Sequence, residues 1–171
     1  KWPAKKTVSF INHHKELGHR ASQVVADHNP YTQQMIEVYE RYEALCSNSG
    51  LVDFTELLLR AYEMLQNDET LRSHYQQRFR HILVDEFQDT NALQYAWLKL
   101  LSADGSFLMA VGDDDQSIYS WRGAKVENMF AFSQDFQGAH TSRLEQNYRS
   151  TSNILNAANE VIHFNSNRMG K

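Results

Sequence analysis

The spacing of apolar residues changes near residue 80, and this change most limits what the chain can fold into. Before it, apolar residues recur every three to four positions, as in amphipathic helices. After it, Ile82–Val84 and Phe107–Val111 are short continuous apolar runs, typical of strands buried on both faces of a parallel sheet. A helical stripe from Leu93 to Leu101 separates them, which completes a strand–helix–strand crossover. The sequence therefore predicts an α/β fold, with a helical lobe followed by part of a parallel sheet.

The helical part carries two apolar stripes and a clear helix start. Asn48–Gly50 is expected to be a turn, and Asp53 with Glu56 three positions later is a plausible capping box. The two expected buried stripes are Met35, Val38, Tyr39, Tyr42 and Leu45, and then Phe54, Leu57, Leu58, Ala61 and Leu65.

The second part predicts further elements around the two strands. Asp89 or Thr90 is expected to cap the central helix, and Asp104–Gly105 to stop it. Two more helices are expected around Val126–Phe130 and Ile154–Ile162, with a third strand near residues 140–144.

Composition excludes several classes of protein. The 171 residues are 42% hydrophobic, enough for one domain or two small lobes. Cys46 is the only cysteine, which excludes a disulfide framework and favours a reducing compartment. We see no signal segment and no apolar run of the roughly 18 residues that cross a bilayer, so we expect no membrane partner. The eight histidines lack metal-ligand spacing.

Acidic residues concentrate in one segment, although the net charge is only −4. Residues 81–115 contain seven Asp or Glu against a single Lys, whereas residues 1–28 are mildly basic. Such an acidic segment suits a bound cation better than bare phosphate. If it lies beside phosphates, a metal ion must lie between them.

An acid pair, Asp85–Glu86, follows the first predicted strand directly. Ligands of parallel sheets bind beyond the carboxyl ends of the strands. In nucleotide hydrolysis one acid can hold Mg²⁺ while its neighbour polarises the attacking water. The alternative is that a polar pair merely ends the strand.

The second strand leads into a polar loop that contains one glutamine and two aromatic residues. Gln116 could donate to a γ-phosphate oxygen or orient water, or it could cap a helix. Tyr119 and Trp121 are two positions apart, so in an extended segment their rings would point the same way, with Arg122 alongside. Such a platform can stack on the bases of a single strand without reading its sequence. The alternative is burial in the core.

Three segments resemble, in order, the second, third and fourth motifs of the UvrD/Rep/PcrA group of superfamily 1 DNA helicases. The segments are Asp85–Asn91, Gly112–Ala124 and Leu144–Ser150, and the resemblance extends to Gly50–Phe54. It implies part of a RecA-like P-loop NTPase motor domain. The chain is then expected to divide into a partial 1B-like helical subdomain (1–79), part of a 1A-like ATPase domain (80–143) and the start of a 2A-like domain (144–171).

The resemblance also implies roles for single residues. Asp85 would bind Mg²⁺, Glu86 would be the catalytic base, and Gln116 would sense the γ-phosphate of ATP. Arg149 would act as an arginine finger, and Tyr148 would stack on adenine. Single-stranded DNA would contact four residues: Phe54, Tyr119, Trp121 and Arg122. For Phe54, burial in the helix stripe is an equal alternative, and Ser120 stands where close relatives often carry glycine.

The phosphate-binding loop G-x-x-x-x-G-K-[ST] (Walker A) is missing from this sequence, whose only Gly-Lys pair is Gly170–Lys171. We therefore expect an internal fragment of an ATP-dependent 3′–5′ DNA helicase of repair, with little or no ATPase activity alone. Single-stranded or junction DNA is the expected partner, repair proteins stay open as partners of the parent, and the resemblance implies the bacterial cytoplasm and nucleoid. The alternatives are a helicase-nuclease of the RecB/AddA type and a non-catalytic interaction module.

Overall fold

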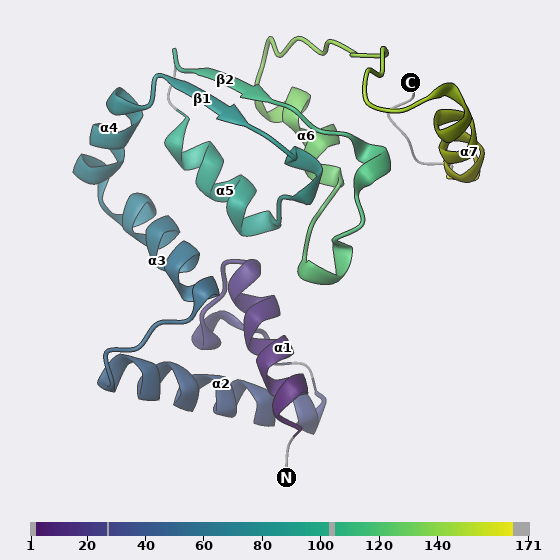
Figure 1. The fold of residues 1–171 in the computed structure, drawn as a ribbon. Helices are drawn as coiled ribbons and strands as arrows, with labels where there is room; N and C mark the ends of the chain where they lie inside the picture. Colours follow the sequence, from purple (N-terminus) through teal and green to yellow (C-terminus); the bar gives the residue numbers. More distant parts are fainter. Residues whose placement is uncertain (1–2, 27, 103–104, 166–171) are drawn as a thin grey trace.

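The structure is a computed structural model that describes residues 3–26, 28–102 and 105–165. It is mixed helix and strand, as the α/β prediction requires (Figure 1). Its helices are α1 (Ala4–Glu16), α2 (Pro30–Asn48), α3 (Phe54–Asn67), α4 (Glu69–Arg78), α5 (Ala92–Leu101), α6 (Glu127–Asp135) and α7 (Ser152–Ile162). The strands are β1 (His81–Val84) and β2 (Phe107–Ala110), and the 3-10 turns are η1 (Ala21–Gln23), η2 (Phe87–Asp89), η3 (Asp114–Gln116) and η4 (Ser120–Arg122).

Helices α1 and α2 form the base of the helical lobe together with η1 (Figure 1). Ile11, Ala21 and Tyr39 share a buried cluster, and the Tyr39 hydroxyl donates to the His19 carbonyl at 3.0 Å. Met35 and Tyr39 are completely buried, as predicted, whereas Leu45 at the end of the same stripe is exposed. The helical prediction for this region is confirmed.

Helix α3 turns a different face inward from the one predicted. Asp53 caps it by accepting from the Glu56 amide at 2.7 Å. The buried residues are Glu56, Leu59 and Leu65, while Phe54 and Leu57 are exposed, so the predicted stripe is wrong at those two positions. The physical reason is ionic, because the Glu56 carboxylate turns inward to pair with Lys15 at 2.7 Å.

Strands β1 and β2 pair in parallel, with His81 opposite Phe107 and Val84 opposite Ala110. One face of this sheet packs on α5 and α6, where Phe87, Tyr95 and Leu98 are buried. The prediction of strands buried on both faces is wrong for the described residues. Three side chains of the other face are exposed, namely Leu83, Phe107 and Met109. Alternation along each strand separates the two faces.

Helix α5 joins the two parts of the molecule, since it contacts α1, α3 and α4 as well as the sheet. Asn91 caps it, accepting from the Gln94 amide at 2.8 Å while Gln94 Oε1 accepts from the Asn91 amide at 2.9 Å. Neither predicted cap is the cap of α5: Asp89 is the last residue of η2, and Thr90 directly follows η2. Asp104, half of the predicted stop, lies outside the described residues.

After α6 the chain leaves the body and runs to α7, which lies apart from the sheet (Figure 1). The strand predicted near residues 140–144 does not form, since these residues have no strand partner. The predicted helices at α6 and α7 are confirmed, but α7 has no buried residue in the part of the chain that the structure describes. No described helix is both long and apolar enough to span a bilayer.

Candidate functional site

The ends of β1 and β2 bring the acid pair beside the loop that follows β2. The Val111 amide donates to the Val84 carbonyl at 2.8 Å, and the Phe87 amide donates to the Val111 carbonyl at 2.9 Å. These bonds continue the sheet ladder past both strands. Asp85–Glu86 and Gly112–Asp113 therefore lie at the same edge, as expected for the carboxyl ends of parallel strands.

Glu86 is held in an uncommon conformation at this edge. Its φ of 51° is the only positive value among the described non-glycine residues. A left-handed backbone costs about 1–2 kcal/mol for a residue with a side chain. The Glu86 amide donates to Asp85 Oδ1 at 3.0 Å, and Glu86 Oε2 accepts from Gln88 Nε2 at 2.6 Å. The two carboxylates thus have separate surroundings.

Asp85 has the features of a Mg²⁺ ligand. It is an exposed carboxylate at the carboxyl end of a strand. Mg²⁺ is usually bound by one or two carboxylates, with phosphate oxygens and waters as its other ligands. The described residues contain no group of three or more His, Cys, Asp or Glu that could hold a metal by itself. A metal ion at Asp85 would therefore need ligands other than these side chains.

Gln116 ends the short turn η3, directly after the acid cluster. Its Nε2 donates to Asp113 Oδ2 at 2.8 Å, and its backbone amide donates to the Asp113 carbonyl at 3.0 Å. Asp113 Oδ1 accepts from the Asp115 amide at 3.1 Å. Asp113 thus fixes the turn that carries Gln116, and Gln116 lies one turn from the sheet edge.

Tyr119, Trp121 and Arg122 lie together, although not on an extended segment. Trp121 and Arg122 lie in η4 and Tyr119 directly precedes it, and the Arg122 amide donates to the Tyr119 carbonyl at 2.8 Å. The two aromatic rings are 6.2 Å apart and tilted by 58°. The Arg122 guanidinium lies 4.5 Å from the Trp121 ring and 5.0 Å from the Tyr119 ring. The expectation of an extended platform is wrong, but Trp121 is 72% exposed and presents an aromatic surface.

Gly123 follows this cluster and meets the helical lobe. Its φ of 79° favours glycine, and a Cβ there would lie 2.7 Å from Glu16 Oε2. Burial raises the pKa of the Glu16 carboxyl. The end of α1 therefore rests on the loop that carries Trp121.

Phe54 is 93% exposed, so the alternative that it belongs to the core is wrong. It is the first residue of α3, directly after the cap Asp53. Tyr42 donates to Asp53 Oδ2 at 2.7 Å and Lys15 to the same atom at 2.8 Å. A rigid cap thus presents an exposed ring.

Tyr148 and Arg149 lie on the exposed segment before α7. Asn147 Oδ1 accepts from the Arg149 amide at 2.9 Å and the Ser150 amide at 2.8 Å, which shapes a turn. Among the described residues, no hydrogen bond or ion pair links either side chain to Asp85, Glu86 or Gln116. The structure does not bring these two groups of predicted site residues together.

Two buried amides were not among the predicted site residues. Gln88 is 1% exposed and lies between the acid pair and Asp113. Asn128 is 7% exposed and donates to the Thr90 carbonyl at 3.0 Å, so it ties α6 to the end of η2. Position in a motif could have indicated Gln88, but nothing in its spacing predicts burial.

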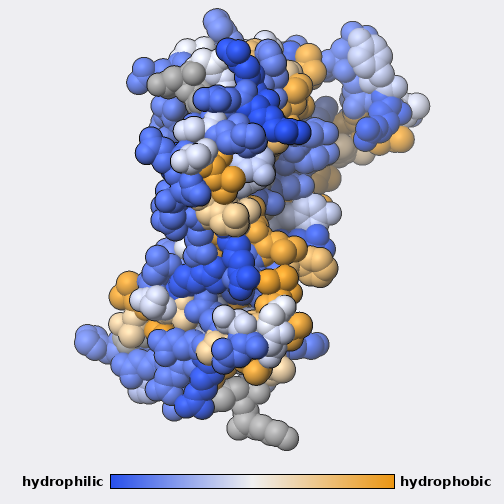
Figure 2. All heavy atoms as spheres, turned by 90° about the vertical axis from the view of Figure 1, so that its left-hand side faces the viewer, coloured by the Kyte–Doolittle hydropathy of each residue, from blue (hydrophilic) through white to orange (hydrophobic). Residues whose placement is uncertain are grey.

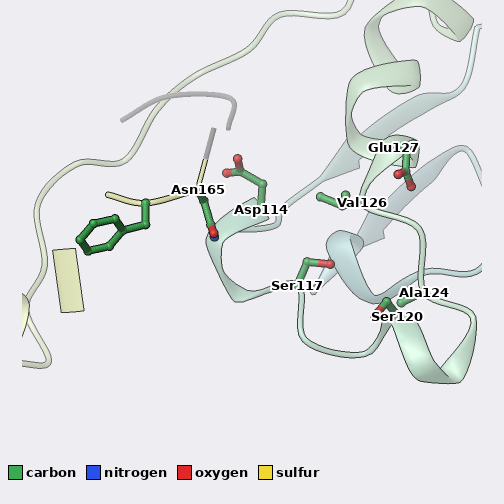
Figure 3. Close-up of a pocket in the computed structure, with 8 residues that line it drawn as sticks. Asp114, Ser117, Ser120, Ala124, Val126, Glu127 and Asn165 are labelled. Atoms are coloured by element: carbon green, nitrogen blue, oxygen red, sulfur yellow. The ribbon is translucent and has the colours of Figure 1, made fainter. Parts of the chain in front are cut away.

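A cavity of about 440 Å³ lies beside the loop that follows β2 (Figure 3). Its walls come from the loop after β2, the start of α6 and the segment after α7, with Asp114, Ser117 and Asn165 among the lining residues. The lining does not include Asp85, Glu86 or Gln116. The cavity is therefore distinct from the acid pair.

Comparison with known proteins gives the family. Residues 1–137 match the family described as UvrD/REP helicase N-terminal domain. The chain belongs to the UvrD/REP helicase family. The fold observed here, a helical lobe against a parallel strand pair, is thus that of part of a UvrD/REP helicase N-terminal domain.

Relatives within the UvrD/REP family include bacterial helicases. DNA helicase II of Escherichia coli (strain K12) is 54% identical over 170 residues, covering 99% of this chain and 24% of the relative. DNA helicase II of Haemophilus influenzae (strain ATCC 51907 / DSM 11121 / KW20 / Rd) is 51% identical over 99% of this chain and 23% of the relative. The ATP-dependent DNA helicase PcrA of Leuconostoc citreum is 46% identical over 84% of this chain and 19% of the relative. The chain spans about a quarter or less of these relatives.

Proposed function

We propose that this chain is the coupling segment of an ATP-dependent DNA helicase that moves 3′ to 5′ and acts in DNA repair. The observation that carries the proposal is the shared edge of β1 and β2, where Asp85–Glu86 lie beside the loop of Gln116 and Trp121. Relatives named DNA helicase II and ATP-dependent DNA helicase support it. The complete protein would work in the bacterial cytoplasm, at the nucleoid.

At the sheet edge, each polar residue has one proposed task. Asp85 would hold Mg²⁺, and the bound ion would neutralise negative charge on the phosphates of ATP. Glu86 orients the attacking water and accepts its proton. Gln116 donates to a γ-phosphate oxygen, for which it exchanges its bond to Asp113 Oδ2. Separate residues are needed because one carboxylate cannot bind the metal and the water proton at once.

The segment from residue 144 is proposed to begin a second, 2A-like motor domain. Exposed Tyr148 and Leu144 support this, as does α7, whose described residues are all solvent-accessible. In the complete protein Tyr148 would stack on adenine and Arg149 would reach the γ-phosphate when the two motor domains close. Residues 80–143 would then be part of the 1A-like, RecA-like domain, and residues 1–79 a partial 1B-like subdomain.

Single-stranded DNA is the proposed partner of the exposed aromatic residues. Trp121 and Phe54 are 72% and 93% exposed, and Arg122 adds a positive charge beside Trp121. Base stacking on an aromatic ring contributes about 1–3 kcal/mol per base and tolerates any sequence. A motor that travels along DNA needs contacts of this kind.

Fluorescence quenching by oligo-dT tests the DNA role in the complete protein. We expect oligo-dT to quench tryptophan emission, and Trp121→Ala to remove that quenching and weaken binding about fivefold to 150-fold, the equivalent of about 1–3 kcal/mol. Trp97→Phe is the matched control, because Trp97 lies on α5 and is expected to leave the quenching unchanged. Equal quenching in Trp121→Ala would favour a non-catalytic interaction module.

The 171-residue chain alone is proposed to hydrolyse little or no ATP, because its sequence lacks the phosphate-binding loop. The complete protein should hydrolyse ATP and lose that activity on Glu86→Gln. Steady turnover by the chain alone, abolished by Glu86→Gln, would contradict the first statement. A complete protein whose activity survives Glu86→Gln would contradict the role of Glu86.

A further inference from the structure

Gln88 is the most deeply buried polar group at the sheet edge. It lies in η2 and is 1% exposed. A buried amide needs a partner for each polar atom, since an unsatisfied group costs about 1–3 kcal/mol. Both atoms of Gln88 have one. Its Nε2 donates to Glu86 Oε2 at 2.6 Å, and its Oε1 accepts from the Asp113 amide at 3.0 Å.

The direction of these two bonds is fixed by their partners. The Asp113 backbone amide can only donate, so it requires the oxygen of the Gln88 side chain. The Gln88 nitrogen is then left facing Glu86 as a donor, which suits a carboxylate.

Gly112 makes room for this amide. A Cβ at Gly112 would lie 2.8 Å from Gln88 Oε1. It would also lie 3.3 Å from the backbone nitrogen of Gln88 and 3.3 Å from that of Phe87. The loop after β2 therefore passes directly over Gln88. The close approach lets one side chain reach Glu86 and the backbone of Asp113 at the same time.

The contacts continue from Asp113 to Gln116. Asp113 receives the Gln88 contact through its backbone, and its Oδ2 accepts from Gln116 Nε2 at 2.8 Å. Hydrogen bonds thus link Glu86 to Gln116 through two residues, Gln88 and Asp113. The backbone of Gln116 then continues into η4 and Trp121.

We propose that Gln88 is a positioning residue for ATP hydrolysis: it orients the Glu86 carboxylate and ties its orientation to the loop of Gln116 and Trp121. The inference rests on the proposed function of Glu86. Gln88 touches neither water nor nucleotide in this role. It acts through Glu86, whose Oε2 accepts from Gln88 Nε2 at 2.6 Å.

The test uses steady-state ATPase kinetics of the complete protein with and without oligo-dT. Gln88→Met keeps the side-chain length and loses both hydrogen bonds, while Gln88→Glu keeps an acceptor for Asp113 and loses the donor to Glu86. We expect both to lower the DNA-stimulated kcat at least tenfold, with KM for ATP and the Kd for oligo-dT changed less than twofold. Gln76→Glu is the matched control, because Gln76 Nε2 donates to the Leu100 carbonyl at 2.8 Å, away from Glu86.

A purely structural role predicts a different pattern. It would lower kcat and raise KM together, or leave Gln88→Glu active because the Asp113 contact survives. Either result would overturn the inference. A double-mutant comparison adds a second readout: in the Glu86→Gln background, Gln88→Met should reduce the residual rate no further, because both changes act on one carboxylate.

Failure of the inference can be separated from failure of the proposed function. If Glu86→Gln abolishes turnover while both Gln88 variants keep a normal kcat, only the inference is wrong. If Glu86→Gln leaves turnover unchanged, the proposed role of Glu86 is wrong, and the inference fails with it.

Discussion

At the scale of single residues, a buried ionic cluster holds the helical lobe together. Lys15 is 2% exposed and contacts Asp53 at 2.8 Å and Glu56 at 2.7 Å. Arg20 contacts Glu56 at 2.8 Å and Glu63 at 2.6 Å. Burial alone would raise the pKa of Asp53 and Glu56, but the hydrogen bonds from Lys15 and their other donors lower it. These bonds fix α3 and so the position of Phe54.

Lys15→Met is expected to destabilise the protein by about 3 kcal/mol, because breaking a buried pair leaves its carboxylates uncompensated. Lys99→Met is the control: Lys99 is 46% exposed at its pair with Asp135, so its loss should cost less than about 1 kcal/mol. Urea unfolding measures both. Equal costs would show that the Lys15 pairs contribute no more than a surface pair.

The same cluster predicts a pH dependence. Since the pKa of Asp53 and of Glu56 is lowered in the folded state, their stabilisation is full above the unfolded value of about 4 and is lost as the pH falls through the folded value. The stability gap between wild type and Lys15→Met should therefore narrow below about pH 4. A gap that widens on acidification would contradict this reading.

At the scale of elements, the end of β2 and the turn η2 fit together only because residue 112 is glycine. Gly112→Ala would place a Cβ against Gln88 Oε1. We expect a cost of about 1–3 kcal/mol and faster hydrogen exchange at the Asp113 amide, whose acceptor is displaced. Gly138→Ala, with open space around it, should leave that exchange rate unchanged. Unaltered exchange in Gly112→Ala would show that the loop yields without disturbing Gln88.

Most element types could be predicted from the sequence, apart from the strand expected near residues 140–144, but the buried faces of α3 and of the two strands could not. The helices and both strands follow from apolar spacing, and the capping residue Asp53 follows from its side chain. The inward face of α3 depends on Glu56, which is buried because it pairs with Lys15. Lys15 lies in another helix, 38 residues before the cap Asp53, so local spacing does not reveal this pair. Likewise the tilt of Tyr119 and Trp121 arises from a 3-10 turn that local alternation does not reveal. Long-range pairs and short turns decided these details.

At the scale of the whole molecule, much apolar surface is uncovered. Hydrophobic patches interrupt the hydrophilic face in Figure 2. One face of the sheet exposes Leu83, Phe107 and Met109, and α7 exposes Ile154 and Val161. An exposed apolar face of this kind marks a surface that another part of a protein commonly covers. This pattern fits the proposal that the described chain is part of a larger motor domain.

Leu83→Asp tests this at the level of the complete protein. In the 171-residue chain Leu83 is 72% exposed, so the substitution should change the free energy of unfolding by less than about 1 kcal/mol. In the complete protein, where the face is proposed to be covered, the same change should cost about 2 kcal/mol or more. Ile82→Ala on the packed face should destabilise both, as denaturant unfolding would measure. An equally small effect of Leu83→Asp in the 171-residue chain and in the complete protein would indicate that the sheet face of Leu83 is exposed to solvent in both.

The contact between Glu16 and Gly123 limits how this protein can be recombined with its relatives. A Cβ at residue 123 would lie 2.7 Å from Glu16 Oε2, so the Glu16 side chain would have to move. A chimera that exchanges α1 alone must therefore bring a side chain at residue 16 that fits under the recipient's loop. Residues 16 and 123 are best taken from the same parent protein. A chimera that takes them from different parents is expected to be less stable than the sequence identity of the parents suggests.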